Sequence, residues 1–144
     1  CLSNQDMNFI ILTNDKLNFN HKNIKIFNNV NNDEKFYLLS RSRALLFPSN
    51  LRAESYGIVT IEAMMYGVPS IIFNINTGLN DLVKHNYNGL VAELDNNNQY
   101  SQLVKKVYFN NLLHKKLSSN SRKFYTKRLE KNGYSKLNKL YSTL

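Results

Sequence analysis

Short apolar runs alternate with segments of helical periodicity through the first two thirds of the chain. Four runs have the length and composition of β-strands: residues 8–13, 23–27, 44–47 and 70–73. From Ile58 onward, apolar residues recur with helical spacing until Gly67, a residue typical of helix ends. Strands joined through a helix pair in parallel, because only a long crossover returns the chain in the same direction. The pattern therefore predicts an α/β fold with a parallel sheet and flanking helices.

The segment between the third and fourth runs carries the clearest functional signal. Pro48 ends the third run, since proline cannot donate to a sheet ladder, and a loop leads to a helix that starts near Gly57. The first amides of a helix are unpaired and its dipole is positive there, which suits a pyrophosphate group. Ligands of parallel sheets bind beyond the carboxyl ends of the strands, where Glu54 falls. With Glu62 about one turn inside the helix, the segment can hold a polyhydroxylated, phosphorylated ligand.

Positive charge is concentrated in the last third of the chain. The net charge is +9, and residues 99–144 hold 11 Lys and Arg against one acidic residue. This segment has amphipathic helical patterning, so it forms either a solvated basic face or a surface attracted to anionic membranes. A nucleic-acid-binding module is a further class for a chain of pI 9.7. We do not expect it, because aromatic residues accompany the basic ones only at Phe124, Tyr125 and Tyr134, a thin stacking platform.

The sequence gives no sign of a metal site or a membrane span. His21, His85 and His114 are isolated and Cys1 is the only cysteine, so no set of residues has ligand spacing. No run approaches the roughly 20 apolar residues that a span requires. A single cysteine suits a reducing compartment. We therefore expect a cytoplasmic protein without a metal ion.

A series of short motifs follows one order along the chain. The series is Phe47-Pro48-Ser49, Glu54-Ser55-Tyr56-Gly57, Glu62-Ala63-Met64, Gly67-Val68-Pro69, Thr77-Gly78-Leu79 and Asn88-Gly89-Leu90-Val91. Together these motifs resemble the C-terminal domain of retaining nucleotide-sugar glycosyltransferases of the GT-B fold, in family 4 (glycosyl transferases group 1). The resemblance implies a Rossmann-like core that binds a nucleotide-sugar over residues 1–98. Residues 99–144 would form basic helices that pack on the same domain.

The resemblance also implies a role for each matching position. Glu54 matches the first glutamate of the family's pair, which holds the donor sugar and is catalytic, and Glu62 matches the second, which binds the ribose. The segment between them would bind the donor sugar and the diphosphate: Ser55, Tyr56, Gly57, Ile58, Val59 and Thr60. Asn29 and Val30 match the place where relatives contact the base. The chain departs from the family pattern where Asn80 replaces a proline and Asp81 a glutamate, so no role is carried over to Asp81.

The chemistry implied by the resemblance is transfer of a sugar from a nucleotide-sugar, such as a UDP- or GDP-sugar, with retention of configuration. The acceptor would be a glycan or a lipid-linked molecule in bacterial surface polysaccharide or lipopolysaccharide synthesis, on the inner face of the cell membrane. No metal or other cofactor is implied. Relative to the family pattern we expect the first strand and helix, with their Arg and Lys pair, and the acceptor-binding domain to be missing. The alternative is an inactive remnant or split fragment of such an enzyme.

Overall fold

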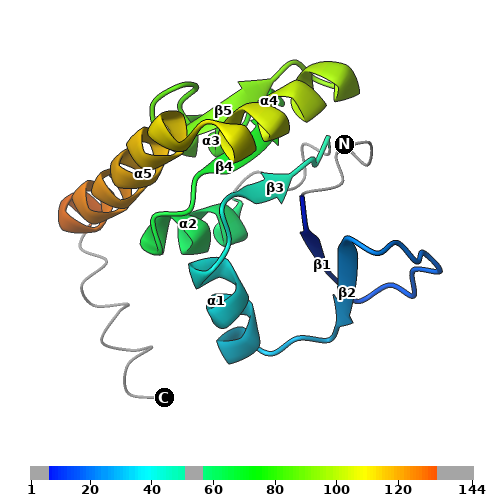
Figure 1. The fold of residues 1–144 in the computed structure, drawn as a ribbon. Helices are drawn as coiled ribbons and strands as arrows, with labels where there is room; N and C mark the ends of the chain where they lie inside the picture. Colours follow the sequence, from blue (N-terminus) through cyan, green and yellow to red (C-terminus); the bar gives the residue numbers. More distant parts are fainter. Residues whose placement is uncertain (1–6, 51–56, 133–144) are drawn as a thin grey trace.

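A parallel α/β architecture is seen in the computed structural model, which describes residues 7–50 and 57–132 (Figure 1). The elements are β1 (Phe9–Thr13), β2 (Ile24–Asn28), α1 (Asn32–Ser40), β3 (Leu45–Phe47), α2 (Ile58–Met65), β4 (Ser70–Phe73), α3 (Gly78–Leu82), β5 (Gly89–Ala92), α4 (Asn97–Phe109) and α5 (Asn111–Asn132). All four predicted strands are present, within a residue of the expected bounds. The predicted α/β class is confirmed.

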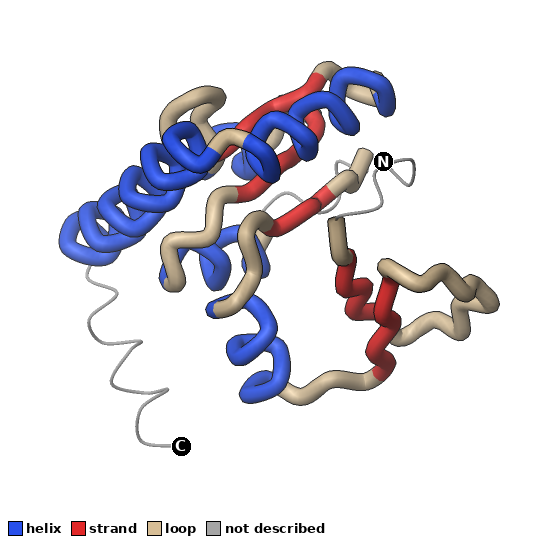
Figure 2. The backbone as a smooth tube through the Cα atoms, viewed as in Figure 1, coloured by secondary structure: helices blue, strands red, loops and turns tan. Residues whose placement is uncertain are grey.

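The strands form two parallel sheets within the described residues. β1 pairs with β2, while β3, β4 and β5 form a second sheet in that order (Figure 2). Residues 14–22 contain no helix, as their small number predicts, and the chain turns back at an isolated bridge between His21 and Ile24. Each remaining parallel pair is joined through a helix, α2 before β4 and α3 before β5. The carboxyl ends of β3, β4 and β5 therefore share one edge.

The hydrophobic core lies between the β3–β4–β5 sheet and the helices around it. All four residues of β4 are buried, as expected of a central strand covered on both faces. The helices α4 and α5 contribute Tyr100, Val104, Val107 and Leu117 to the same core. The helices α4 and α5 therefore pack on the sheet that precedes them.

A buried hydrogen bond and a close backbone approach are both made to strand β4 in this core. The Tyr100 hydroxyl donates to the carbonyl oxygen of Ile71 at 2.7 Å, and burial raises the pKa of this phenol. At Gly89 an added Cβ would lie 2.5 Å from the carbonyl oxygen of Ser70. This distance is far inside van der Waals contact, so only glycine allows β5 to approach β4 at this point.

The helix α2 is confirmed, and its apolar spacing indicated the buried side only in part, since Met64 is buried and Ile61 packs against the core. Thr60, Ala63 and Met64 are buried, whereas Ile58 is 69% exposed. The buried set follows i, i+3 and i+4 spacing, so the helix presents one stripe to the core and leaves its first residue outside. Ile58 thus lies outside the core.

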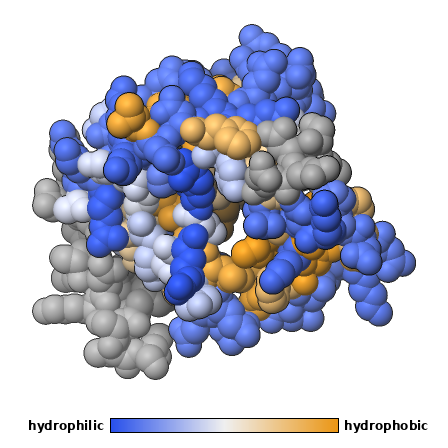
Figure 3. Space-filling view, in the orientation of Figure 1, coloured by the Kyte–Doolittle hydropathy of each residue, from blue (hydrophilic) through white to orange (hydrophobic). Residues whose placement is uncertain are grey.

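The β1–β2 pair lies beside the main sheet and leaves apolar side chains in contact with solvent. Alternate residues of its strands point outward, and Ile10, Leu12 and Phe27 are all exposed. Figure 3 shows hydrophobic surface in this part of the molecule. Met7 and Phe9, by contrast, join the core of the main sheet.

Candidate functional site

The site predicted from the glutamate pair lies where β3 leads to α2. β3 ends at Phe47 and α2 begins at Ile58, so the connection starts at the carboxyl end of a parallel strand. Glu54, Ser55 and Tyr56 lie outside the described residues, as does Arg52. The described part of the predicted site therefore consists of residues 57–62 and the elements around them.

Gly57 sets the start of α2. Its backbone is left-handed, with φ 45° and ψ 52°, a conformation that costs most other residues energy. An added Cβ would also lie 2.5 Å from Cδ1 of Leu79, in α3. Glycine therefore lets the first turn of α2 lie directly against α3, close to the edge where the strands end.

The first turn of α2 presents backbone donors. The amides of Thr60 and Ile61 donate to the carbonyl oxygen of Gly57, at 2.8 and 3.3 Å. Within residues 7–50 and 57–132, no backbone carbonyl accepts from the amides of Ile58 or Val59. The first turn has no acidic side chain, so nothing there neutralises the positive end of the helix dipole. The amides of Ile58 and Val59, two of the predicted phosphate contacts, thus have no carbonyl partner among the described residues, whereas the Thr60 amide already donates to Gly57 and would have to share this hydrogen bond with a ligand.

The side chain of Thr60 lies under this turn. The residue is fully buried, and its hydroxyl oxygen has no hydrogen-bond partner among the described residues. The hydroxyl is 3.3 Å from the position of a Cβ at Gly57. Thr60 therefore supports the turn from inside the fold, and any contact it makes with a ligand would come from its backbone.

Glu62 forms an ion pair that the sequence did not indicate. Its Oε1 lies 2.7 Å from Nζ of Lys35, and the two side chains are only 19% and 24% exposed. Lys35 comes from the start of α1, and its ammonium also lies 4.9 Å from the ring centroid of Phe36. The helices α1 and α2 are thereby joined through opposite charges about one turn from their starts. Lys35 is a functional candidate that sequence reasoning missed, because its position depends on how two helices pack.

The end of β2 leads into this same helix pair. Asn29 is exposed and has φ 52°, and Val30 is half-buried. Asn31 then caps α1: its side chain accepts from the Glu34 amide, and the Glu34 carboxylate accepts from the Asn31 amide, both at 2.9 Å. The predicted base-contact residues therefore directly precede the helix that carries Lys35.

The loop after β4 is organised by Asn80, the residue that replaces the family's proline. Its side-chain oxygen accepts from the amides of Ile75 and Thr77, at 3.2 and 3.3 Å. Asp81, next to it, has a side chain that is 80% exposed and pairs with Lys84 at 3.4 Å. Asn80 thus holds the loop in shape through hydrogen bonds that a proline could not make, while Asp81 points to solvent.

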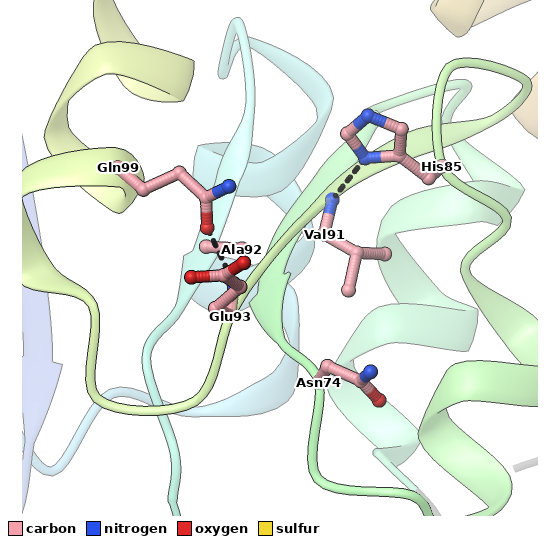
Figure 4. A pocket seen from close by; sticks show the side chains of 6 residues that line it. All are labelled: Asn74, His85, Val91, Ala92, Glu93 and Gln99. Atoms are coloured by element: carbon pink, nitrogen blue, oxygen red, sulfur yellow. Dashed lines mark hydrogen bonds between the residues drawn. The ribbon is translucent and has the colours of Figure 1, made fainter.

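A shallow cavity of about 280 Å³ lies beside the outer strand β5 (Figure 4). It is lined by Asn74, His85, Val91, Ala92, Glu93 and Gln99. The Val91 amide donates to Nδ1 of His85 and the Glu93 amide to Oε1 of Gln99. These two side chains therefore accept hydrogen bonds from backbone amides along the outer edge of the strand. None of the described residues with predicted roles lines this cavity.

The arginine that precedes β3 holds helices rather than a ligand. Arg43 donates from Nε to the Val107 carbonyl and from Nη2 to Oδ1 of Asn111, at 3.1 and 2.7 Å. His114 lies 3.0 Å from the Arg43 carbonyl oxygen, and burial together with the guanidinium charge lowers its pKa. This cluster lies at the amino end of β3, the end opposite the candidate site.

Neither a metal-binding cluster nor a membrane-spanning helix is present in the described residues. No group of three or more His, Cys, Asp or Glu side chains is arranged to hold a metal ion in residues 7–50 and 57–132. Over the same residues, none of the helices combines the length and the hydropathy needed to cross a bilayer.

Comparison with known proteins decides the family. The family model described as "Glycosyl transferases group 1" matches residues 14–124, which is more than half of the chain. The chain belongs to the glycosyl transferases group 1 family. The resemblance inferred from the motif series is thus confirmed, and the match extends into α5 of this group 1 chain.

Curated relatives of this group 1 chain include named sugar transferases. The D-rhamnosyltransferase WbpZ of Pseudomonas aeruginosa is 39% identical over 71 residues, which are 49% of this chain and 19% of WbpZ. An uncharacterized glycosyltransferase of Methanocaldococcus jannaschii is 30% identical over 85% of this chain and 36% of its own length. The O-antigen chain mannosyltransferase C of Escherichia coli is 26% identical over 65% of this chain and 25% of its own length. The chain spans 19% to 36% of the length of these relatives.

Solved structures share the fold of this group 1 chain. Anabaena HepE in complex with UDP-glucose superposes with a TM-score of 0.69 and 18% identity, over 85% of this chain and 33% of HepE. TarM superposes with a TM-score of 0.63 and 24% identity, over 81% of this chain and 23% of TarM. The parallel sheet with flanking helices is therefore similar to GT-B glycosyltransferase structures.

Proposed function

We propose that this chain forms the donor-binding half of a glycosyltransferase that transfers a sugar from a nucleotide-sugar with retention of configuration. The acceptor is a glycan or a lipid-linked molecule, in the synthesis of a bacterial surface polysaccharide or lipopolysaccharide. The observation that carries the proposal is the start of α2, where two backbone amides at the positive helix end have no carbonyl partner among the described residues and the Glu62 carboxylate belongs to the same helix. The names of the rhamnosyl- and mannosyltransferase relatives support the product class.

In this proposal the helix start receives the diphosphate and Glu62 receives the ribose. A diphosphate gains from the amides of Ile58 and Val59 and from the dipole of an eight-residue helix. The ribose carries two neighbouring hydroxyls, which both donate well to one carboxylate. The Lys35 contact uses Oε1 of Glu62. Among the described residues, Oε2 has no hydrogen-bond partner, so it can accept from the ribose hydroxyls, as can the remaining lone pairs of Oε1.

Glu54 is the proposed catalytic residue, and this assignment rests on the match to the family motif. In a retaining transfer the bond from the anomeric carbon to the phosphate oxygen breaks, and the transition state has oxocarbenium character. Negative charge then grows on the leaving diphosphate, so fixed positive groups aimed at it lower the barrier. The helix start is one such group. Because backbone donors and cationic side chains can do this work, we propose a reaction that uses no metal ion.

Two substitutions in the full-length protein test this assignment. Glu54→Gln should lower kcat for sugar transfer by about 100-fold or more, the loss typical of removing a group that acts in the transition state. Glu62→Gln should mainly raise the Kd for the nucleoside diphosphate, by roughly tenfold to a hundredfold for a charged hydrogen bond. Asp15→Asn, an exposed loop carboxylate, is the matched control. Unchanged transfer and unchanged binding in both glutamate variants would refute the proposal.

Direct titration separates this proposal from the reading as an inactive remnant. NMR spectra of the chain should shift on addition of UDP or GDP, with the largest changes at residues 29–30 and 57–62. Selective response to one nucleotide would identify the base. If no nucleotide or nucleotide-sugar perturbs the spectrum, the chain is better explained as a remnant that keeps the sheet without a working site.

A further inference from the structure

The junction between α4 and α5 exposes two large apolar side chains among lysines. Leu112, in the first turn of α5, is 82% exposed, and Phe109, the last residue of α4, is 56% exposed. Lys105 and Lys106 precede Phe109 by four and three residues, and Lys115 and Lys116 follow Leu112 by three and four. Residues at these spacings are neighbours on a helix surface. Each exposed apolar side chain is thus flanked by two lysines, and we call these six residues the elbow surface.

The same charge pattern continues along the outer face of α5. Leu112, Lys116, Ser119, Lys123 and Lys127 follow one another at intervals of three or four residues, and all five are exposed. The opposite face of the helix carries Leu117 and Ser121, which are fully buried. From Leu112 to Lys127 this exposed stripe is about 22 Å long at the helical rise per residue. It contains no acidic residue.

Over the part of the chain that the structure describes, these cations have no acidic partners. The ion pairs of the described residues are Lys35 with Glu62 and Lys84 with Asp81, and α4 and α5 carry no Asp or Glu from residue 97 to residue 128. In the orientation of Figure 3, hydrophilic surface dominates the area of α4 and α5, with exposed hydrophobic residues among it. The face therefore combines an uncompensated positive field with projecting apolar groups.

Contacts beneath the elbow surface hold it in a fixed shape. Arg43 bonds to the Val107 carbonyl and to Asn111 on either side of the turn. The Asn110 side chain accepts from the Leu113 amide at 2.9 Å and so caps α5. The Phe109 ring packs edge-on against Tyr108, with centroids 5.1 Å apart. The exposed apolar groups are thus presented by a rigid turn and would lose little conformational entropy on binding.

We propose that the elbow surface and the outer stripe of α5 dock the protein onto an anionic membrane. Phe109 and Leu112 enter the interfacial region of the bilayer, while the lysines pair with anionic headgroups, as in helices that lie in a membrane interface. The apolar pair distinguishes this partner from nucleic acid, since a phosphate backbone offers no apolar layer for Leu112. The inference is independent of the proposed sugar transfer, because none of these residues belongs to the candidate site.

Vesicle co-sedimentation of the full chain tests this docking surface. The protein should bind vesicles of equal parts phosphatidylcholine and phosphatidylglycerol, and binding to phosphatidylcholine alone should be much weaker. The double variant Lys115→Gln/Lys116→Gln should lower the partition coefficient roughly 30-fold, at about fivefold for each near-surface lysine, and reduce its dependence on salt. Leu112→Ser should weaken binding about tenfold without changing the salt dependence, since it removes an apolar contact.

Matched substitutions elsewhere serve as controls. Lys16→Gln/Lys22→Gln removes two exposed lysines, and Leu17→Ser removes an exposed leucine, all from the loop between β1 and β2. These variants should bind like the unmodified chain, and far-UV circular dichroism should confirm that every variant is folded. Equal loss in the control and elbow variants would overturn the proposal, as would equal binding to both kinds of vesicle. Binding to RNA in place of vesicles, unaffected by Leu112→Ser, would also overturn it and assign the face to a polyanion.

Discussion

The Lys35–Glu62 ion pair permits a quantitative test of how α1 and α2 are joined at the candidate site. The test is a double-mutant cycle of Lys35→Met, Glu62→Gln and the double variant. Such a cycle separates the interaction energy of the pair from the effects of changing each side chain alone. The pair is close, at 2.7 Å, and its side chains are 24% and 19% exposed. It thus lies between the surface pairs that contribute 0.2–1 kcal/mol and the buried pairs whose disruption costs about 3–5 kcal/mol. We expect a coupling of about 1–2 kcal/mol.

Urea unfolding of the four proteins, followed by circular dichroism, measures this coupling. The pair of Lys84 and Asp81 is a matched control within the same chain, since it is longer, at 3.4 Å, and its side chains are 51% and 80% exposed. The cycle of Lys84→Met and Asp81→Asn should give less than about 0.5 kcal/mol. Equal couplings for the two pairs, or a Lys35–Glu62 coupling below about 0.3 kcal/mol, would refute the reasoning from burial.

Three further predictions concern groups outside the site. Burial raises the pKa of Tyr100, so the contribution of this phenol to stability is present below the unfolded pKa of about 10 and is lost as the pH rises above it. In Tyr100→Phe, the urea midpoint should no longer show this alkaline decline. An unchanged plot of urea midpoint against pH would contradict the prediction. The pKa of His114 is lowered, so its contribution to stability is present above about pH 6.5 and is lost as the pH falls. His114→Gln should flatten the acid side of the plot of urea midpoint against pH. An equally steep decline in the variant would contradict the prediction. Gly89→Ala places a Cβ against a strand carbonyl and should lower the free energy of unfolding by about 2 kcal/mol or more, whereas a change within about 0.5 kcal/mol would mean that β5 can move aside.

Local signals in the sequence were sufficient for most of the main elements. The strands at 44–47 and 70–73 are short apolar runs that proline and glycine punctuate, and such signals act within a few residues. The helix α1 was not predicted, because its residues lack a clear apolar stripe. Its start was nonetheless legible, since Asn31 and Glu34 have the spacing of a capping box.

The exposed face of α2 shows where periodicity alone is insufficient. Four of the first five residues of this helix are apolar or β-branched, so several stripes fit the same sequence. The choice among them comes from tertiary packing, in which Gly57 lies against Leu79 and Thr60 turns inward below it. The buried threonine and the exposed isoleucine therefore depend on the tertiary contacts of α2, including those with α3, which is distant in sequence from the start of α2.

The ion pair of Glu62 also bears on how the proposed site accepts a diphosphate. An unpaired carboxylate in the helix whose first turn binds the diphosphate would repel that diphosphate. At low local dielectric this repulsion would offset part of the attraction that the helix dipole contributes. The Lys35 ammonium beside Glu62 cancels this charge while leaving carboxylate oxygens to accept from ribose hydroxyls. Sequence reasoning predicted Glu62 as a ribose-binding residue and missed its counter-charge, because Glu62 belongs to a motif and Lys35 is brought to it by a contact between helices. In the proposed donor complex, removing Lys35 should therefore weaken binding of a nucleoside diphosphate more than that of the uncharged nucleoside, a difference that titration calorimetry with Lys35→Met can measure.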